Sequence, residues 1–269
     1  ISLSLGEPDF HTPEFIKDAA IEALAQNYTT YTPVPGYDDL RESIAHKFLR
    51  DNNLTYTKDQ IVVSTGAKQS IANLIMALVD TGDEVVIPTP YWVSYSEIVK
   101  MSEGIPVMIR TTAESGYKVT PEQVEAAITP KTKLFMFSSP CNPTGAVYTK
   151  EELAALAGVF NNHPDVYIMS DEIYEYINFD GKHESIAQFP EVYNQTITVN
   201  GFAKGFAMTG WRVGWIVAPP ELGQTLENLI QYSTSGVAQF MQRGAVAALD
   251  HGDGFVGENI ARARQSRDI

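Results

Sequence analysis

The chain has 269 residues, enough for one large α/β domain, and its formal net charge is -14. That charge disfavours nucleic acid and anionic membranes as partners, so a phosphorylated ligand needs a local pocket. A single cysteine, Cys141, excludes an internal disulfide framework, and no apolar run reaches the ~18 residues that span a bilayer. The start lacks the basic and apolar regions of a signal peptide, and we therefore expect a soluble, cytoplasmic protein.

The first part of the chain predicts two helices joined by a loop. Thr12 and Pro13 predict a helix cap and first helical position, and apolar residues over 16–24 keep helical spacing. Residues 28–36 are rich in Thr, Tyr and Pro, which predicts an extended loop. A second helix is expected over about residues 40–48, where apolar residues again recur on one face.

From residue 61 onward, short β-branched runs alternate with helical patterns. The expected strands are 61–64, 84–87, 107–110, 134–138, 166–170, 196–199 and 213–218. The expected helices are about 68–79, 91–102, 121–128 and 150–160, and capping boxes open the last two, Thr120 with Gln123 and Thr149 with Glu152. This alternation predicts a three-layer α/β fold with a mainly parallel sheet and helices on both faces.

Unusual loops follow several of the expected strands. They comprise residues 65–68, 90–92, 139–145 and 170–174, and Lys204 follows the strand over 196–199. Because ligands bind at the carboxyl ends of parallel strands, we expect these loops to form one ligand-binding rim.

Lys204 and Arg212 are the only cations between residues 198 and 214, and both lie among aromatic, small and apolar neighbours. Such surroundings lower the pKa of a lysine toward that of a usable amine nucleophile, and an arginine there suits a phosphate. A buried helix–strand junction, with two side chains that reach the solvent, explains the same pattern.

Gly66-Ala67-Lys68 joins a strand to a helix and would present backbone amides to an anion, although an ordinary tight turn has the same pattern. The sequence contains neither GxxxxGK[ST] nor GxGxxG, which disfavours nucleoside triphosphates and dinucleotides. A smaller phosphate ester fits this junction better.

Four further rim residues have both a structural and a functional interpretation. Asp171 follows an apolar run and is either a helix cap or a buried partner for a cation. Trp92 and Tyr174 are either packing residues or ligand contacts, and Asn142 beside Pro143 is either a turn residue or a donor. Taken together, the amides, aromatic ring, acid, phenol, side-chain amide, amine and arginine of this rim match pyridoxal 5′-phosphate.

The motifs resemble those of a known enzyme family. They are Gly6-Glu7-Pro8-Asp9-Phe10, Tyr31, Ser64-Thr65-Gly66-Ala67-Lys68-Gln69, Tyr91-Trp92-Val93-Ser94-Tyr95, Asn142-Pro143-Thr144-Gly145, Ser170-Asp171-Glu172-Ile173-Tyr174, Lys204 and Trp211-Arg212-Val213-Gly214. In order and spacing they are similar to those of the fold-type I, pyridoxal-phosphate-dependent class I/II aminotransferases, and most similar to the bacterial aspartate aminotransferase subgroup.

The resemblance implies a role for each rim residue and no metal ligand. Lys204 would form the Schiff base and carry the proton between Cα and C4′, while Asp171 would hold the pyridinium. The other cofactor contacts would be Asn142 and Tyr174 to the ring oxygen, Trp92 on the ring face, and the amides of Gly66, Ala67 and Lys68 with Arg212 on the phosphate.

The resemblance also implies the substrate contacts and the assembly. The reaction would be ping-pong transfer of an amino group between an L-amino acid, aspartate or glutamate, and a 2-oxo acid. Gly6 would approach the substrate carboxylate, with Trp92 and Asn142 nearby. Lys68 would meet the distal carboxylate, although a solvated lysine or a phosphate contact explains it too. A tyrosine matching Tyr31 reaches the neighbouring subunit's phosphate in the family, which implies a homodimer with shared sites.

The chain departs from the family pattern in two ways. Gly201 stands where many relatives have a serine that bonds the phosphate. The chain also begins with Ile1 rather than Met, ends inside an amphipathic run, and has no counterpart of the arginine that clamps the substrate α-carboxylate. We therefore expect a fragment with impaired transamination: an N-terminal segment over 1–30, a cofactor-binding large domain over 31–255, and over 256–269 the start of a linker helix to an absent small domain.

Two other functions are compatible with the same cofactor residues. A pyridoxal-phosphate-dependent C–S β-lyase could share all of them, because the reaction type depends on what surrounds the substrate Cα. A non-catalytic, aminotransferase-like sensor domain of a transcription regulator is the second alternative, and the acidity of the chain argues against it.

Overall fold

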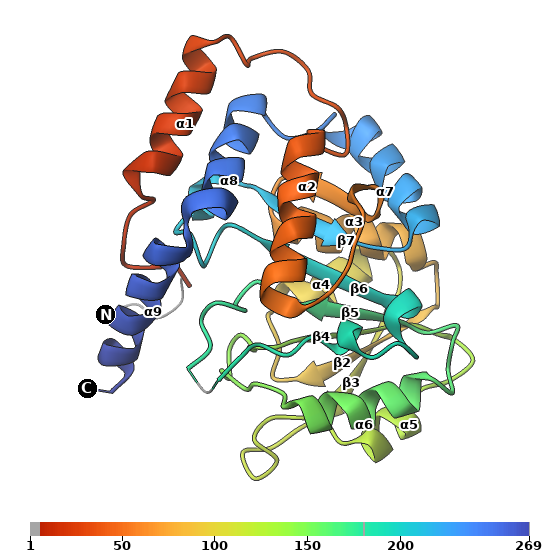
Figure 1. The fold of residues 1–269 in the computed structure, drawn as a ribbon. Helices are drawn as coiled ribbons and strands as arrows, with labels where there is room; N and C mark the ends of the chain where they lie inside the picture. The colour runs from red at the N-terminus through yellow and green to blue at the C-terminus, as the bar shows by residue number, and fades with distance from the viewer. Residues whose placement is uncertain (1–5, 180, 269) are drawn as a thin grey trace.

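The computed structural model describes residues 6–179 and 181–268, which are built around a seven-stranded sheet (Figure 1). The strands are β1 (Ile61–Ser64), β2 (Glu84–Thr89), β3 (Ile105–Arg110), β4 (Thr132–Ser138), β5 (Tyr167–Asp171), β6 (Thr196–Gly201) and β7 (Gly214–Val217). Their order is β1-β7-β6-β5-β4-β2-β3. β7 runs antiparallel to β1 and β6, and the other neighbours are parallel, which confirms the mainly parallel sheet.

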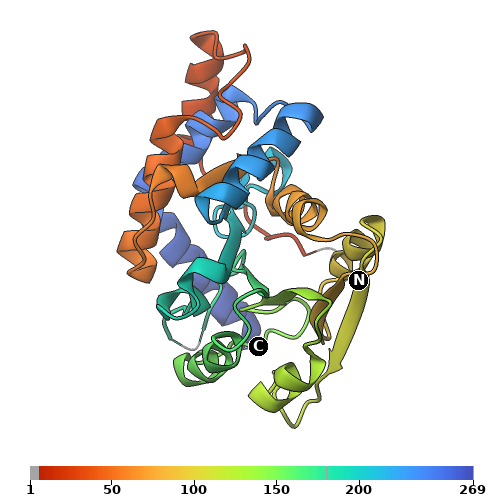
Figure 2. The same cartoon turned by 90° about the vertical axis from the view of Figure 1, so that its right-hand side faces the viewer.

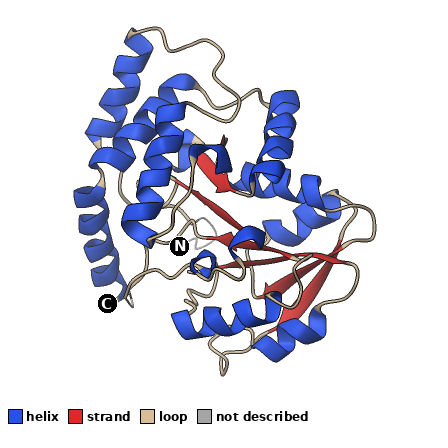
Figure 3. Cartoon of the chain, turned by 45° about the vertical axis from the view of Figure 1, so that its right-hand side comes forward, coloured by secondary structure: helices blue, strands red, loops and turns tan. Residues whose placement is uncertain are grey.

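The helices cover the sheet from both sides (Figure 3). They are α1 (Glu14–Ala25), α2 (Asp38–Lys47), α3 (Ala67–Leu78), α4 (Ser94–Met101), α5 (Pro121–Ala127), α6 (Lys150–Phe160), α7 (Pro220–Ser233), α8 (Gln239–His251) and α9 (Asp253–Arg267). The expected capping boxes at Thr120 and Thr149 are confirmed. The sequence patterns did not predict α7 and α8.

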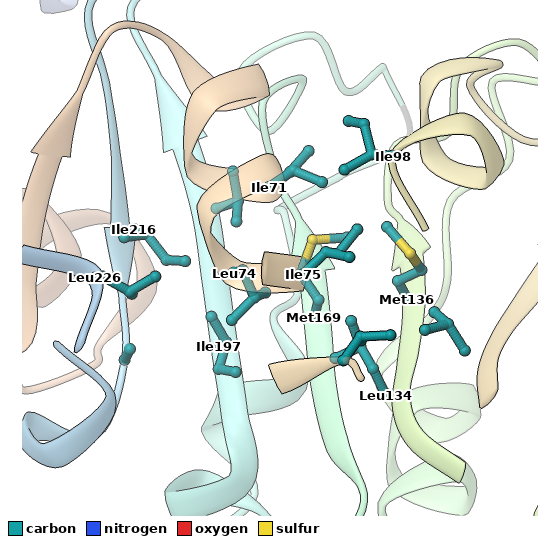
Figure 4. Packing of buried hydrophobic residues seen from close by; sticks show 14 of the residues in the cluster. Ile71, Leu74, Ile75, Ile98, Leu134, Met136, Met169, Ile197, Ile216 and Leu226 are labelled. Atoms are coloured by element: carbon teal, nitrogen blue, oxygen red, sulfur yellow. The ribbon is translucent and has the colours of Figure 1, made fainter. Parts of the chain in front are cut away.

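The two faces of the sheet have separate cores, because side chains alternate along each strand. Figure 4 shows Leu74 and Ile75 of α3 packed on one face, near Ile197 and Leu134 of the strands. Helices α4 and α7 complete that layer, whereas α2 and α8 cover one half of the opposite face and α6 the other half. The three-layer α/β architecture expected from the sequence is confirmed.

The N-terminal segment is fixed to the loop that carries Lys204. The prediction that Thr12 caps α1 is wrong: α1 begins at Glu14 after an N-cap Pro13 that offers no side-chain hydrogen bond. The Thr12 hydroxyl instead donates to the carbonyl oxygen of Ala207 and accepts from the indole nitrogen of Trp211 at 3.2 Å.

Helix α1 lies alongside α8, near the other end of the chain (Figures 1 and 2). Within residues 6–179 and 181–268, none of the helices combines the length and the apolar character that a membrane span needs.

Helix α4 starts at Ser94, later than the expected residue 91, because the chain first makes a turn. In this turn the amide of Tyr95 donates to the carbonyl oxygen of Trp92 at 3.0 Å.

The strand register brings the expected loops to one edge. Ser138 at the end of β4 is level with Asp171 at the end of β5, and Asp171 is level with Val199 near the end of β6. The first residue of β7, Gly214, is paired with Gly201 on one side and with Ser64, the last residue of β1, on the other. The segments that follow β1, β4, β5 and β6 therefore meet at this edge.

Candidate active site

A cavity of about 680 Å³ opens at this edge of the sheet, within the range of roughly 300–1,000 Å³ that is typical of small-molecule sites. Nine residues predicted for the site line it: Gly6, Ala67, Lys68, Trp92, Asn142, Asp171, Tyr174, Lys204 and Arg212. Tyr31 does not line the cavity, and its side chain is 91% exposed. Gly66 is not in the cavity lining either; it lies just before α3, where its lack of a side chain leaves room for Arg212.

The N-terminus of α3 forms one end of the cavity. Gly66 is the N-cap of this helix, with φ near +90°, a backbone conformation that residues other than glycine rarely adopt. Its N–H donates to the carbonyl oxygen of Ser64 at 2.8 Å, so the prediction of Gly66 as an anion donor is corrected. The amides of Ala67 and Lys68 have no acceptor among the described residues, and they remain available for an anion.

Arg212 lies against this helix end. Its guanidinium donates to the carbonyl oxygens of Thr209, at 2.9 Å, and Thr65, at 3.4 Å. A Cβ atom at Gly66 would lie 2.6 Å from Nη2 of Arg212, so only a glycine lets the guanidinium come this close. A cation beside the positive end of a helix dipole is unfavourable unless an anion joins them. The geometry therefore favours a bound anion such as a phosphate.

Replacing Arg212 tests the anion end directly. We expect Arg212→Lys to weaken binding of pyridoxal 5′-phosphate by roughly 10–100-fold, because one ammonium replaces a fork of guanidinium donors. Quenching of tryptophan fluorescence on titration with the cofactor measures the affinity. Pyridoxal, which lacks the phosphate, is the control ligand and should bind both proteins equally. An equal loss for both ligands would contradict the assignment.

Two glycines leave no room for a side chain where β6 and β7 meet the start of α3. A Cβ atom at Gly201 would lie 2.8 Å from Cα of Gly214, and one at Gly214 would lie 2.6 Å from the amide nitrogen of Ala67. Strands β6 and β7 and the start of α3 are thus in backbone contact. A serine at position 201 has no room unless the backbone shifts.

We expect Gly201→Ser to destabilise the chain instead of adding a phosphate donor. Overpacking of this kind costs about 1–3 kcal/mol, which lowers Tm by roughly 3–10 °C in a chain of this size. Thermal unfolding without cofactor measures the effect. The control is Gly158→Ser in α6, where a Cβ atom meets nothing within 4 Å. Unchanged Tm together with tighter cofactor binding would refute this explanation.

Asp171 forms the opposite end of the site and is buried. Its Oδ2 accepts from the Tyr95 hydroxyl at 2.6 Å, and its Oδ1 accepts from the amide of Ile173 at 3.2 Å. Burial raises the pKa of Asp171 to about 6, although the bonds from Tyr95 and Ile173 favour the carboxylate. The carboxylate therefore caps a turn, not the helix of the structural interpretation, and it also faces the cavity.

Tyr95 is a site residue that the sequence patterns did not single out. It lies in the first turn of α4 and is buried. Its hydroxyl binds Oδ2 of Asp171, the carboxylate oxygen that the Ile173 amide does not use. Its position within the Tyr91–Tyr95 motif was the only available signal. Nothing in the spacing showed that its hydroxyl reaches a residue so far along the chain.

Lys204 lies between these two ends. It is half-buried, and its Nζ donates to the carbonyl oxygen of Gly6. Burial lowers the pKa of Lys204, and the nearby Arg212 lowers it further, while Glu7 and Asp171 oppose the shift. The amine is therefore easier to deprotonate than that of an ordinary lysine, as a nucleophilic role requires.

The remaining predicted residues surround the amine. The Asn142 side-chain amide donates to the Tyr174 hydroxyl at 3.3 Å, and Nζ of Lys204 lies 5.6 Å from the centre of the Tyr174 ring. Trp92 forms an aromatic wall of the cavity, and Nζ of Lys68 lies 4.8 Å from the centre of its ring. The site thus gathers polar groups around one amine.

The donor set fits pyridoxal 5′-phosphate. Free amides and a guanidinium lie at one end of the cavity, a buried carboxylate lies at the other, and the amine lies between them. The Gly66 cradle supports the fit, because any side chain there would displace the guanidinium from the anion position. A phosphate at one end, an aldehyde in the middle and a ring nitrogen at the other end match this order.

Comparison with known proteins agrees with this chemistry. The family model "Aminotransferase class I and II" matches residues 1–269. An aspartate/prephenate aminotransferase of Cereibacter sphaeroides is 46% identical, and the match covers 100% of this chain and 68% of that protein. An aspartate aminotransferase of Bacillus subtilis is 47% identical, with 92% of this chain and 63% of that protein covered.

Solved structures give the same result. The crystal structure of the aspartate aminotransferase from Rhizobium meliloti has a TM-score of 0.97 and 44% identity, covering 99% of this chain and 67% of that one. The Thermus thermophilus aspartate aminotransferase with maleate has a TM-score of 0.95 and 44% identity, covering 99% of this chain and 70% of that one. The chain belongs to the class I and II aminotransferases, which depend on pyridoxal 5′-phosphate.

Proposed function

We propose that this chain transfers an amino group between L-aspartate or L-glutamate and a 2-oxo acid. The observation that carries the proposal is the position of the Lys204 amine, between the buried Asp171 carboxylate and the anion end formed by Arg212 and α3. When bound, pyridoxal 5′-phosphate supplies an aldehyde for amines and a ring that withdraws electrons from the substrate Cα.

Each residue of the site has a role in this proposal. Lys204 would supply the amine for the aldehyde and would carry a proton at its Nζ, because its lowered pKa suits both tasks. Asp171 would keep the ring nitrogen protonated, and Tyr174 with Asn142 would hold the ring oxygen. Trp92 would pack against the ring. Gly6, whose carbonyl already meets the amine, approaches the substrate carboxylate.

The dicarboxylic substrate is supported by Lys68 and by the relatives. Lys68 lies at the cavity wall beside Trp92, in the first turn of α3, where a cation is disfavoured by the helix dipole unless it meets an anion. The relatives are called aspartate or aspartate/prephenate aminotransferases, and the Thermus thermophilus structure contains maleate, a dicarboxylate. We therefore propose that Lys68 pairs with the distal carboxylate.

A homodimer is part of the proposal. Tyr31 is 91% exposed and Val93 is 74% exposed, and Val93 belongs to the cavity lining. Large exposed aromatic and apolar side chains, one of them in the cavity lining, suit a subunit interface. The division of the chain at residues 30 and 255 stays a prediction, as does the cytoplasmic location; residues 1–5 lie outside the described part.

Product analysis tests the proposed reaction. The purified chain is incubated with pyridoxal 5′-phosphate and L-aspartate, with and without 2-oxoglutarate. We expect glutamate and oxaloacetate to form in equal amounts and over many turnovers when the 2-oxo acid is present. Without it, oxaloacetate should not exceed one equivalent per cofactor and no glutamate should form. Release of pyruvate and ammonia from a β-substituted amino acid, without any 2-oxo acid, would instead identify a lyase. Cofactor binding without either product would contradict the proposed reaction.

A further inference from the structure

A cluster of four buried ionisable side chains lies beside the cofactor site but outside its cavity. It consists of Lys47 at the end of α2, Glu172 and Glu175 just after β5, and His183 in the following loop. The side chains of Lys47 and Glu172 are fully buried, and that of His183 is 7% exposed. Charges are costly to bury without partners, so the contacts within this cluster need an explanation.

The four side chains form two close ion pairs, and Lys47 Nζ also lies 3.8 Å from Oδ2 of Asp51. Lys47 Nζ lies 2.5 Å from Glu175 Oε2, and His183 Nε2 lies 3.0 Å from Glu172 Oε2. The second contact is an ion pair without hydrogen-bond geometry, since neither ring nitrogen makes a hydrogen bond to a described residue. The other carboxylate oxygen of Glu172 accepts from the hydroxyls of Ser170, at 2.9 Å, and Ser185, at 2.6 Å.

The cluster does not require a metal ion. Ligand atoms of Glu172, Glu175 and His183 lie within 4.8 Å of one another, as they would around a metal. However, Lys47 already contacts Glu175, and these two carboxylates with one ammonium and one imidazolium carry no net charge. Asp51, which lies 3.8 Å from Lys47, is paired more closely with Arg50, at 2.6 Å. The balance depends on a protonated His183.

The cluster is joined to both segments that carry the reactive groups. Glu172 directly follows Asp171, and its carboxylate is buried on the cluster side. Glu175 accepts from the Asn200 side chain at 2.8 Å, and Asn200 lies on β6, four residues before Lys204. A change of charge in the cluster therefore reaches Asp171 through its nearest neighbour.

Burial is the main cause of the raised pKa of Asp171, and the negative charge of the adjacent buried Glu172 raises this pKa further. Burial disfavours a charged His183, but the Glu172 carboxylate, helped by Glu175 and opposed by Lys47, raises the pKa of His183 above its ordinary value. The imidazolium in turn offsets burial and lowers the pKa of Glu172. Tyr95, Glu172 and Lys204 are the other charged or titratable groups that act on Asp171.

We propose that His183 is a positioning residue for the cofactor: as an imidazolium it neutralises Glu172, so that the adjacent Asp171 carboxylate faces the cavity as the anion that the ring nitrogen needs. The inference rests on the proposed role of Asp171. Without the positive charge of His183, the uncompensated Glu172 disfavours the Asp171 carboxylate. As the pH falls, Asp171 then takes up its proton at a higher pH than in the unaltered chain, and cofactor binding weakens at that higher pH.

The test measures the titration of Asp171 in the full chain without cofactor, by carbon-13 NMR of labelled aspartate carboxyls. The Asp171 signal is assigned with Asp171→Asn. The variants are His183→Gln, Glu172→Gln and the double variant. His163→Gln is the control, because His163 also lies 3.0 Å from a glutamate carboxylate, that of Glu125, but in a hydrogen-bonded pair at the surface. Cofactor affinity between pH 5 and 8 is the second readout.

We expect His183→Gln to raise the titration midpoint of Asp171 and to weaken cofactor binding at pH 7 by about threefold or more. Glu172→Gln and the double variant should both lower the midpoint, and the double variant keeps the test valid if His183→Gln alone does not fold. The inference is overturned if His183→Gln shifts the midpoint no more than His163→Gln does, or if the double variant titrates above the unaltered chain. Because Asp171 is measured without cofactor, either result stands whether or not the proposed reaction is found.

Discussion

Lys204→Ala should abolish amino-group transfer, with a loss of at least about 10⁴-fold in kcat/KM, because one amine serves as both nucleophile and proton carrier. The structure gives the physical reason. The Lys204 amine is half-buried between a carboxylate and a guanidinium, and its pKa is lowered first by burial and then by Arg212. Among the described residues, Lys68 is the one other lysine that lines the cavity, and it lies at the wall beside Trp92.

The measurement combines a coupled assay for oxaloacetate with an absorption spectrum of the protein after cofactor addition. Lys204→Ala should bind the cofactor without the absorption band of a Schiff base. The control is Lys100→Ala, since Lys100 is exposed and Glu97 is its ion-pair partner among residues 6–179 and 181–268. A Lys204→Ala protein with near-normal turnover would show that a different amine reacts.

Asp171→Asn should lower turnover by about 10²–10⁴-fold, because an amide cannot keep the ring nitrogen protonated. The pH dependence gives a sharper test. Asp171 has a pKa raised to about 6 by burial, so its carboxylate is present above that pH and is lost as the pH falls through it. The affinity of the unaltered chain for the cofactor should therefore decrease when the pH is lowered below about 6.

The difference between the two proteins isolates Asp171, because the cofactor's own ionisations are common to both. In a plot of cofactor affinity against pH, Asp171→Asn should lack the decrease near pH 6 that Asp171 causes.

The stability of the fold depends on pH in the opposite direction to cofactor affinity. A carboxyl whose folded pKa is raised above 3.8 stabilises the fold below that value, and this contribution is lost as the pH rises through about 6. At pH 8 without cofactor, Asp171→Asn should unfold at a temperature no lower than the unaltered chain does.

Much of the fold could be predicted from the sequence because its signals are local. Runs such as Ile61–Ser64 are buried on both faces of the sheet, and such strands appear as continuous apolar segments. The rim followed from topology alone, since parallel strands end at one edge. This places Asp171 and Lys204 near each other although many residues separate them.

The missed features depend on contacts between distant segments. Thr12 has the sequence pattern of a helix cap, yet its hydroxyl is used by Ala207 in the loop after Lys204. Tyr95 was only one member of a matching motif, and its bond to Asp171 forms only when α4 lies over the sheet. The pairing of Lys47 with Glu175 joins α2 to the segment after β5, and no spacing predicts it.

The central claim is that one lysine of this chain holds pyridoxal 5′-phosphate. Borohydride reduction of the chain with bound cofactor, followed by proteolysis and mass spectrometry, tests it most directly. We expect a single modified peptide that spans residues 201–212, with the added mass on Lys204. A modified peptide that contains Lys68 or any other lysine, or an unmodified chain, would contradict the claim.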